Sequence, residues 1–151
     1  MATNPQSDLI LVFDAGTQSI RAALIDRQGA IRHMVKTPIE PYFSRQPGWA
    51  EQEPAYYWQN LTATARKLLS SDKVDSDRIA GVTVTSQRTT VINLDRNGVP
   101  LRPAILWLDQ RKADMEHNLS PFLRGALKAV NKYAIVEKAV RECKSNWMRQ
   151  N

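Results

Sequence analysis

The segment Leu9–Asp26, with the sequence LILVFDAGTQSIRAALID, restricts the fold of this chain more than any other. Its first part, Leu9–Phe13, is a continuous apolar run with β-branched residues, which is typical of a buried strand. Ser19–Asp26 predicts a second strand, and Arg27-Gln28-Gly29 is turn chemistry that leads into a third strand, Ala30–Lys36. The chain is therefore expected to begin with a meander of three antiparallel strands.

A long loop and a helix are predicted to follow the meander. The four prolines between Thr37 and Pro54 disfavour regular structure, so this stretch predicts a long ordered loop. Pro54 suits the first position of a helix, which we expect to end near Ser71. The apolar residues that recur at helical spacing, and so predict the buried face of this helix, are Trp58, Leu61, Ala65, Leu68 and Leu69.

The second half of the chain predicts further strands and then helices. Ile79–Thr85, Val91–Leu94 and Ile105–Trp107 have the composition of short strands, and Asn97-Gly98 indicates a tight reversal. Helical patterns resume from Asp109. Near the C-terminus one apolar stripe is formed by Ile135, Val136, Ala139, Val140, Cys143 and Trp147. Together these patterns predict an α/β fold in which helices flank a mixed sheet.

Composition narrows the function classes. With 151 residues, 42% of them hydrophobic, the chain can bury the core of one domain. No apolar run approaches the roughly 18 residues of a membrane span, and residues 1–8 form a polar leader without the apolar segment of a signal peptide. The single cysteine, Cys143, excludes an internal disulfide and fits a reducing compartment. A cytoplasmic protein without a membrane partner is expected.

The net charge of +6 brings nucleic acid into consideration as a partner. From Arg124 onward, however, the Lys and Arg residues occur at helical intervals rather than in a cluster. Such spacing indicates a solvated helix face, and the chain contains no recognised nucleic-acid-binding motif. No nucleic-acid partner is predicted.

The turn after Asp14 is the first candidate site. A tight turn exposes backbone N–H groups, and with Gly16 and the hydroxyls of Thr17 and Ser19 it can form a concavity that binds an anion such as phosphate. Asp14 would repel phosphate unless it held Mg²⁺ through water, and Arg21 could add a charged donor. The alternative is an ordinary hairpin whose side chains satisfy the turn. The chain has neither a P-loop nor a dinucleotide fingerprint.

A second set of polar and aromatic residues follows the predicted strands Ile79–Thr85 and Ile105–Trp107. Open sheets that contain parallel strands bind their ligands at such strand ends. Amide, carboxylate and guanidinium groups can read sugar hydroxyls, and an indole packs on the apolar face of a sugar. Taken singly, Asp109 could instead cap a helix, Trp107 could be core, and Arg111 could be a solvated charge. The residues of this set are Gln87, Arg88, Trp107, Asp109 and Arg111.

These motifs together resemble the FGGY carbohydrate kinases of the actin-like ATPase superfamily. DAGTQSIRAALID is similar to the first phosphate motif of that family, PGWAEQEPAYYW to its loop and first helix, and VTSQRTTVINLDRNGVPLRPAILWLDQR to its sugar-binding strands. The resemblance implies a ribonuclease H-like fold. It also implies that residues 9–151 form an incomplete first domain and that the second, nucleotide-binding domain is absent.

The resemblance further implies roles for the candidate residues. Asp14, Gly16, Thr17 and Gln18 are expected near the γ-phosphate of ATP and Mg²⁺, with Arg21 fixing the loop. Gln87, Arg88 and Trp107 are expected to line the sugar pocket, joined by Asp109 and Arg111. The catalytic base of the family, an aspartate, has no counterpart in this chain and is expected beyond Asn151. The chain alone is therefore predicted to be inactive.

Two departures from the family pattern bear on the substrate. Members that phosphorylate glycerol carry a glutamate where this chain has Thr89, and members that act on xylulose tend to have histidine where Arg88 stands. Two other function classes stay open. One is a non-catalytic sugar-binding or self-associating module, including a homodimer, and the other is a different actin-like ATPase.

Overall fold

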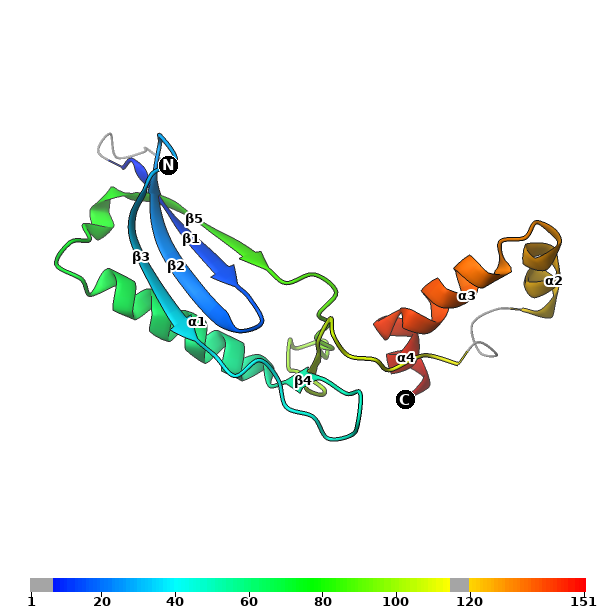
Figure 1. Cartoon of the computed structure of the whole chain (residues 1–151). Coiled ribbons are helices and arrows are strands. Elements are labelled where there is room, and N and C mark those ends of the chain that lie inside the picture. Colours follow the sequence, from blue (N-terminus) through cyan, green and yellow to red (C-terminus); the bar gives the residue numbers. More distant parts are fainter. Residues whose placement is uncertain (1–6, 115–119) are drawn as a thin grey trace.

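The computed structural model describes residues 7–114 and 120–151 (Figure 1). A four-stranded sheet with one helix on it forms the N-terminal part, and three helices lie at the other end of the molecule. The predicted polar leader lies outside the described residues except for Ser7 and Asp8. The elements in chain order are β1 (Leu9–Ala15), β2 (Ser19–Asp26), β3 (Ile31–Pro38), β4 (Glu51–Gln52), α1 (Pro54–Leu69), the 3₁₀ helix η1 (Ser76–Arg78), β5 (Ile79–Ser86), β6 (Ala104–Ile105), α2 (Pro121–Ala129), α3 (Tyr133–Glu142) and α4 (Lys144–Gln150).

The sheet has the strand order β3-β2-β1-β5 and confirms the predicted α/β class. β1 pairs with β2, and β2 with β3, in antiparallel fashion, as the meander predicted. β5 pairs with β1 in parallel, with Asp14 opposite Thr85 and Ala15 opposite Ser86. Because parallel strands end at the same edge of a sheet, the turn after β1 lies beside the segment that follows β5.

The hydrophobic core lies between the sheet and α1. Side chains alternate between the two faces of a strand, so every second residue of β1 contributes to this core while Asp14 points to the opposite face. Thr64 fastens the helix to the sheet, since its buried hydroxyl lies 2.7 Å from the Thr37 hydroxyl of β3. The buried members of the core are Leu9, Leu11, Phe13, Ala22, Leu24 and Leu68.

The predicted helix is confirmed, but its predicted apolar face is only partly buried. Leu68 is 0% exposed, whereas Trp58 is 66% exposed and Leu69 is 39% exposed. The sheet covers only one stripe of α1, and these two residues lie outside that stripe. The helix ends at Leu69 with its C-cap at Ser70, close to the predicted end near Ser71.

Two of the predicted strands are shorter than expected. Val91–Leu94 contributes only isolated bridges, Val91 to Ile105 and Leu94 to Pro100, and the predicted strand Ile105–Trp107 is reduced to β6. The reversal at Asn97-Gly98 is confirmed, with Gly98 at a φ of 79°. These segments pair with each other and with the loop before α1, not with the main sheet, so no long ladder forms.

The predicted helix from Asp109 is wrong for residues 109–114, which have no regular structure; residues 115–119 lie outside the described part of the chain. The Asp109 carboxylate accepts the backbone N–H of Arg111, a local turn that competes with a helix. The C-terminal stripe is also interrupted, because Cys143 is extended and separates α3 from α4. Among the described helices, none has the length and apolar character needed to cross a membrane.

Replacing Leu68 by alanine tests the packing of α1 on the sheet. The fully buried side chain leaves a cavity, so we expect the free energy of unfolding to fall by about 3 kcal/mol. Leu69→Ala is the matched control and should cost less than about 1 kcal/mol because that side chain is partly exposed. Urea denaturation followed by circular dichroism measures both. Equal losses would show that α1 does not dock as described.

Candidate functional site

The turn between β1 and β2 is held by its own backbone. The N–H of Gly16 donates to the carbonyl of Ser19 over 3.0 Å, and a Cβ on Gly16 would lie 3.2 Å from the same oxygen. A side chain at this position would crowd the Ser19 carbonyl, so the turn favours glycine here. Within residues 7–114 and 120–151, the backbone N–H groups of Thr17 and Gln18 donate to no other group. The turn thus presents two free amides in succession, which is the arrangement that binds an anion.

Asp14 and Arg21 form an ion pair across the β1–β2 hairpin. Arg21 Nη1 lies 2.5 Å from Asp14 Oδ2, and the two side chains are 41% and 40% exposed, respectively. Arg21 therefore fixes the orientation of the carboxylate next to the turn. Within the described part of the chain, no group of three or more His, Cys, Asp or Glu side chains could hold a metal ion. A cation at Asp14 would consequently depend on water and ligand oxygens for most of its coordination.

A chain of hydrogen bonds joins the two candidate motifs. The indole Nε1–H of Trp107 donates to the Thr17 hydroxyl over 3.0 Å, and that hydroxyl donates to Oε1 of Gln87 over 2.7 Å. Nε2 of Gln87 then donates to the hydroxyl of Tyr57, at 3.0 Å. The structure thereby brings the turn residue Thr17 into contact with two residues of the predicted sugar-binding set.

Tyr57 was missed by the sequence interpretation. It precedes Trp58 near the start of α1, and helical periodicity did not place it on the apolar face. Burial raises the pKa of Tyr57 above its usual value of 10.0, so the hydroxyl stays protonated at neutral pH. No spacing signal marked this residue, because its partner Gln87 lies 30 positions further along the chain.

Trp107 lies between two cavities. One, of about 440 Å³, is lined by the turn residues Gly16 to Ser19 together with Arg21 and Trp107. The other, of about 840 Å³, is lined by Trp107, Asp109 and Arg111 on one side and by residues of the α3–α4 junction, including Lys144, on the other. A ligand that contacts the exposed indole could therefore extend toward the turn.

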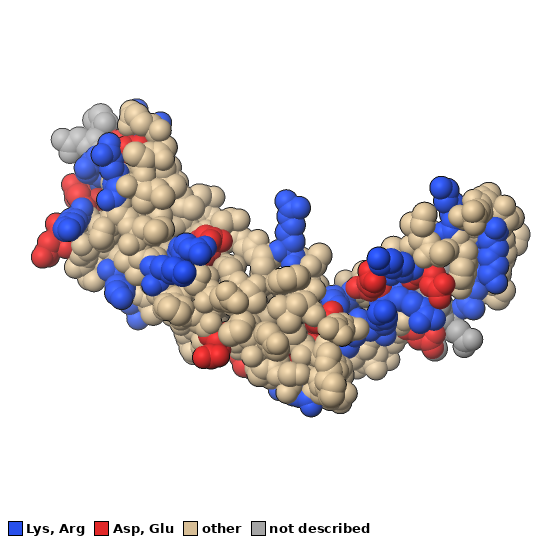
Figure 2. Space-filling model, viewed as in Figure 1, with Lys and Arg blue, Asp and Glu red and all other residues tan. Residues whose placement is uncertain are grey.

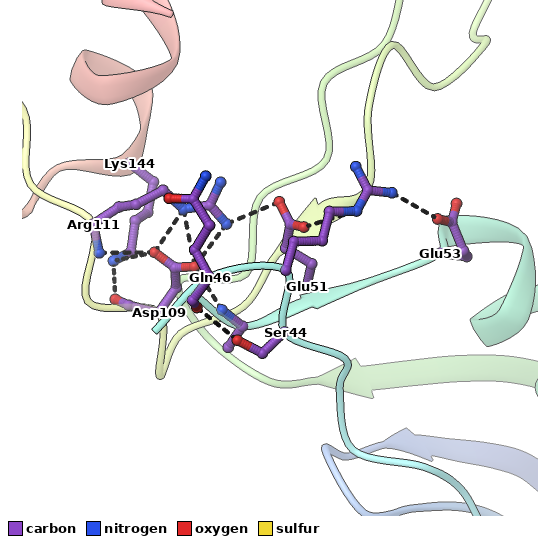
Figure 3. A network of polar contacts seen from close by, with 9 residues as sticks. Ser44, Gln46, Glu51, Glu53, Asp109, Arg111 and Lys144 are labelled. Carbon is purple, nitrogen blue, oxygen red and sulfur yellow. Dashed lines mark hydrogen bonds and ion pairs between the residues drawn. The ribbon is translucent and has the colours of Figure 1, made fainter. Parts of the chain in front are cut away.

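Asp109 and Arg111 form a buried ion network, shown in Figure 3. Their side chains are 0% and 3% exposed. Arg111 Nη2 donates to Asp109 Oδ2 over 2.7 Å and to Glu51 Oε1 over 3.0 Å. Its guanidinium carbon also lies 4.0 Å from the ring centre of Trp49 and 4.6 Å from that of Trp147. Arg111 is therefore neither a solvated charge nor a freely presented sugar ligand.

The same network connects the loop after β6 to the C-terminal helices. Nζ of Lys144 donates to the carbonyl oxygen of Asp109, and the N–H of Ala113 donates to the carbonyl of Arg141 over 2.8 Å. Asp109 does not cap a helix, contrary to the alternative considered above. The contributions of Glu51, Trp49, Trp147 and Lys144 could not be found from the sequence, because they come from separate segments.

The network also sets the protonation of Asp109. Burial alone would raise the pKa of this carboxyl group, but hydrogen bonds from Arg111 and from the backbone N–H of Ala50 outweigh burial and hold the pKa below its usual value of 3.8. Asp109 is therefore ionised at neutral pH. Since the charge is paired with Arg111, it stabilises the position of the segment that carries Trp107.

Arg88 is not brought into this group. Its side chain is exposed, and it lies next to Thr89, which adopts a φ of 58°. Within the described residues the Arg88 side chain forms no hydrogen bond or ion pair with Thr17, Gln87 or Trp107. Its place in a sugar pocket stays a prediction.

Charged side chains are dispersed over the visible face of the molecule. Figure 2 shows Lys and Arg on the sheet end and over the C-terminal helices, interspersed with Asp and Glu. On α3, Arg141 pairs with Glu137 at 3.2 Å. The cationic surface on this side is therefore broken into small areas.

Comparison with known proteins identifies relatives of the chain. Residues 9–151 match the profile of the FGGY family of carbohydrate kinases, N-terminal domain. The chain is 38% identical over 110 residues to a glycerol kinase of Burkholderia cenocepacia (strain HI2424), a match that covers 72% of this chain and 22% of that protein. The chain thus spans about a fifth of the length of this relative.

Solved structures show the same architecture. The xylulose kinase from Rhodospirillum rubrum matches with a TM-score of 0.62 and 34% identity over 68% of this chain and 21% of that one. The Plasmodium falciparum glycerol kinase with ADP matches with a TM-score of 0.56 and 35% identity, again over 68% of this chain and 21% of that one. These matches confirm the predicted fold, present here in part.

Replacing Asp109 by asparagine tests the ion network. The variant removes one of the two buried carboxylates that pair with Arg111, so the free energy of unfolding should fall by about 3 kcal/mol at pH 7. Because the pKa of Asp109 is lowered in the folded state, its stabilising contribution is present above pH 3.8 and is lost as the pH falls through the folded-state pKa. The difference in free energy of unfolding between wild type and variant, measured by urea titration, should therefore shrink as the pH is lowered below 3.8.

Glu53→Gln is the matched control. The Glu53 side chain is 56% exposed, and its carboxylate lies as far as 4.0 Å from the nearest nitrogen of Arg45, so this ion pair is weak. The free energy of unfolding of this variant should differ from that of the wild type by less than about 0.5 kcal/mol at pH 7 and at pH 3. A loss in Asp109→Asn that is the same at pH 7 and pH 3 would contradict a role for the carboxylate charge.

Proposed function

Because this chain belongs to the FGGY family of carbohydrate kinases, we propose that it is the N-terminal portion of an ATP-dependent kinase that phosphorylates a sugar or polyol. The γ-phosphoryl group of ATP would pass to a hydroxyl group of the substrate. The hydrogen bonds from Trp107 to Thr17 and from Thr17 to Gln87 carry the proposal, since they link the turn after β1 to the segments after β5 and β6. A cytoplasmic location belongs to the same proposal.

The turn is assigned to the phosphate. The free N–H groups of Thr17 and Gln18 are donors suited to the γ-phosphoryl oxygens, and Gly16 and the buried Ser19 shape the turn. The hydroxyl of Thr17 donates to Gln87, so this residue meets the phosphate through its backbone. Asp14, held by Arg21, would carry hydrated Mg²⁺, an ion that supplies positive charge to the phosphate oxygens when bound.

The sugar is assigned to the exposed indole and its neighbours. Trp107 is 54% exposed and offers an apolar ring face, and Gln87 offers an amide. Arg88, which is exposed, would reach the sugar by a change of rotamer. Asp109 and Arg111 are buried in the ion network, so their proposed contribution is to hold the Trp107 segment in place.

The chain alone is expected to have no kinase activity. No aspartate in it is assigned as the general base. Phosphoryl transfer also requires protein groups on both sides of the cleft to position the two substrates. We therefore expect sugar binding without turnover. Enzyme-like ATP-dependent phosphorylation of a sugar by the isolated chain would contradict this expectation.

Sugar titration tests the pocket. Glycerol, xylulose and gluconate are titrated while tryptophan fluorescence is recorded. Trp107→Phe is expected to weaken binding about tenfold, because the ring face is smaller and the N–H that donates to Thr17 is lost. Trp58→Phe is the matched control, since Trp58 is 66% exposed on α1, and it should leave the affinity unchanged. Arg88→Ala is titrated in parallel, and unchanged binding would remove Arg88 from the pocket. If none of these three compounds binds, the result would count against the proposal.

Self-association is a second candidate function, favoured by β5. This strand is an edge of the sheet, its sequence IAGVTVTS carries no charge, and Val82 and Val84 are 62% and 59% exposed. An uncharged edge strand is a template for pairing with another strand. Sedimentation should then show a dimer that Val84→Lys abolishes, while Ile31→Lys on the opposite edge strand β3 leaves it intact. A monomer at all concentrations would exclude this function.

A further inference from the structure

We propose that Tyr57 is a positioning residue of the kinase site, whose hydroxyl fixes the orientation of the Gln87 amide and, through it, of Thr17 and Trp107. The inference rests on the proposed function for its meaning in sugar recognition. Its structural part rests on the three hydrogen bonds that run from Trp107 through Thr17 and Gln87 to Tyr57.

The donor at the start of this hydrogen-bond relay, the indole N–H of Trp107, determines the direction of the three hydrogen bonds. An indole N–H can only donate, so the Thr17 oxygen must accept from Trp107. The single hydroxyl proton of Thr17 is then given to a carbonyl oxygen, which orients Oε1 of Gln87 toward Thr17. The amide nitrogen consequently faces the Tyr57 hydroxyl, which accepts. A flipped amide would lose both the acceptor for Thr17 and the donor to Tyr57.

Tyr57 supplies this acceptor from a rigid element. It lies in the first part of α1, and that helix is anchored on the sheet by the buried residues Thr64 and Leu68. Its side chain is half-buried. Because the helix does not depend on the turn for its position, Tyr57 is a fixed reference for Gln87, which lies just beyond the end of β5.

The arrangement limits what the site can offer to a substrate. The indole N–H of Trp107 and the hydroxyl proton of Thr17 are both engaged, and so is one N–H of Gln87. The remaining N–H of Gln87 is a donor, so this amide would recognise a substrate oxygen as acceptor. With the amide fixed in this sense, the indole of Trp107 is left to contact the substrate through its ring face.

The experiment compares Tyr57→Phe with Tyr56→Phe by NMR of the ¹⁵N-labelled chain. The indole N–H signal of Trp107 is assigned by its absence in Trp107→Phe. In Tyr57→Phe we expect this signal to shift and its exchange with solvent to rise at least about threefold, because the relay loses its terminal acceptor. Tyr56→Phe removes the same atom from the neighbouring residue, whose hydroxyl accepts the N–H of Glu40, and should leave the signal unchanged.

Gln87→Leu is the second variant and keeps the test independent of the stability of Tyr57→Phe. It should produce the same change in the Trp107 signal, and the double variant Tyr57→Phe, Gln87→Leu should add nothing to Gln87→Leu alone. An unchanged Trp107 signal in Tyr57→Phe, or additive effects in the double variant, would overturn the proposal.

Sugar titration separates this inference from the proposed function. For a polyol that binds the wild type, Tyr57→Phe should weaken the affinity about fivefold and Tyr56→Phe should not. An affinity that Tyr57→Phe leaves intact, despite a changed Trp107 signal, would overturn the role of Tyr57 in recognition. If the Trp107 signal responds as expected and no polyol binds the wild type, the proposed function fails while the hydrogen-bond relay is upheld.

Discussion

The parallel pairing of β1 with β5 is the constraint on which the candidate site depends. It aligns Ala15 with Ser86, so two segments separated by about 70 residues leave the sheet at the same edge. The backbone N–H of Gln87 still donates to the carbonyl of Ala15 at 3.3 Å, which continues the pairing past the end of β5. With a different register Thr17 and Gln87 would not lie within hydrogen-bonding distance, and the turn would be an isolated hairpin.

A second layer of order comes from Arg111. Its guanidinium is held by two carboxylates and lies over the rings of both Trp49 and Trp147, whose centres are 5.7 Å apart in an edge-to-face arrangement. A buried cation is tolerated only when its donors and charge are satisfied, so the loop before α1, the loop after β6 and α4 must come together around it. Trp107 is positioned two residues before the Asp109 carboxylate that completes this set.

The relatives differ in the substrates that their names give, since one is a glycerol kinase and another a xylulose kinase. The family resemblance implies that Thr89 and Arg88 are the positions at which this chain departs from those two groups. The structure adds that Thr89 has a left-handed backbone conformation, with a φ of 58°. The residue pattern did not predict this local conformation after β5.

The sequence by itself determined the meander, the helix from Pro54 and the residue types at both strand ends, because these follow from local periodicity and turn chemistry. It erred at Asp109, where a side-chain hydrogen bond to the backbone replaced the expected helix, and it could not separate a presented Arg111 from a buried one. Only the tertiary structure decided that Tyr57 meets Gln87 and that Glu51, Trp49, Trp147 and Lys144 surround Asp109 and Arg111. Contacts between distant segments depend on the register of the sheet and on which charged side chains become buried. Neither can be predicted from the spacing of residues along the chain.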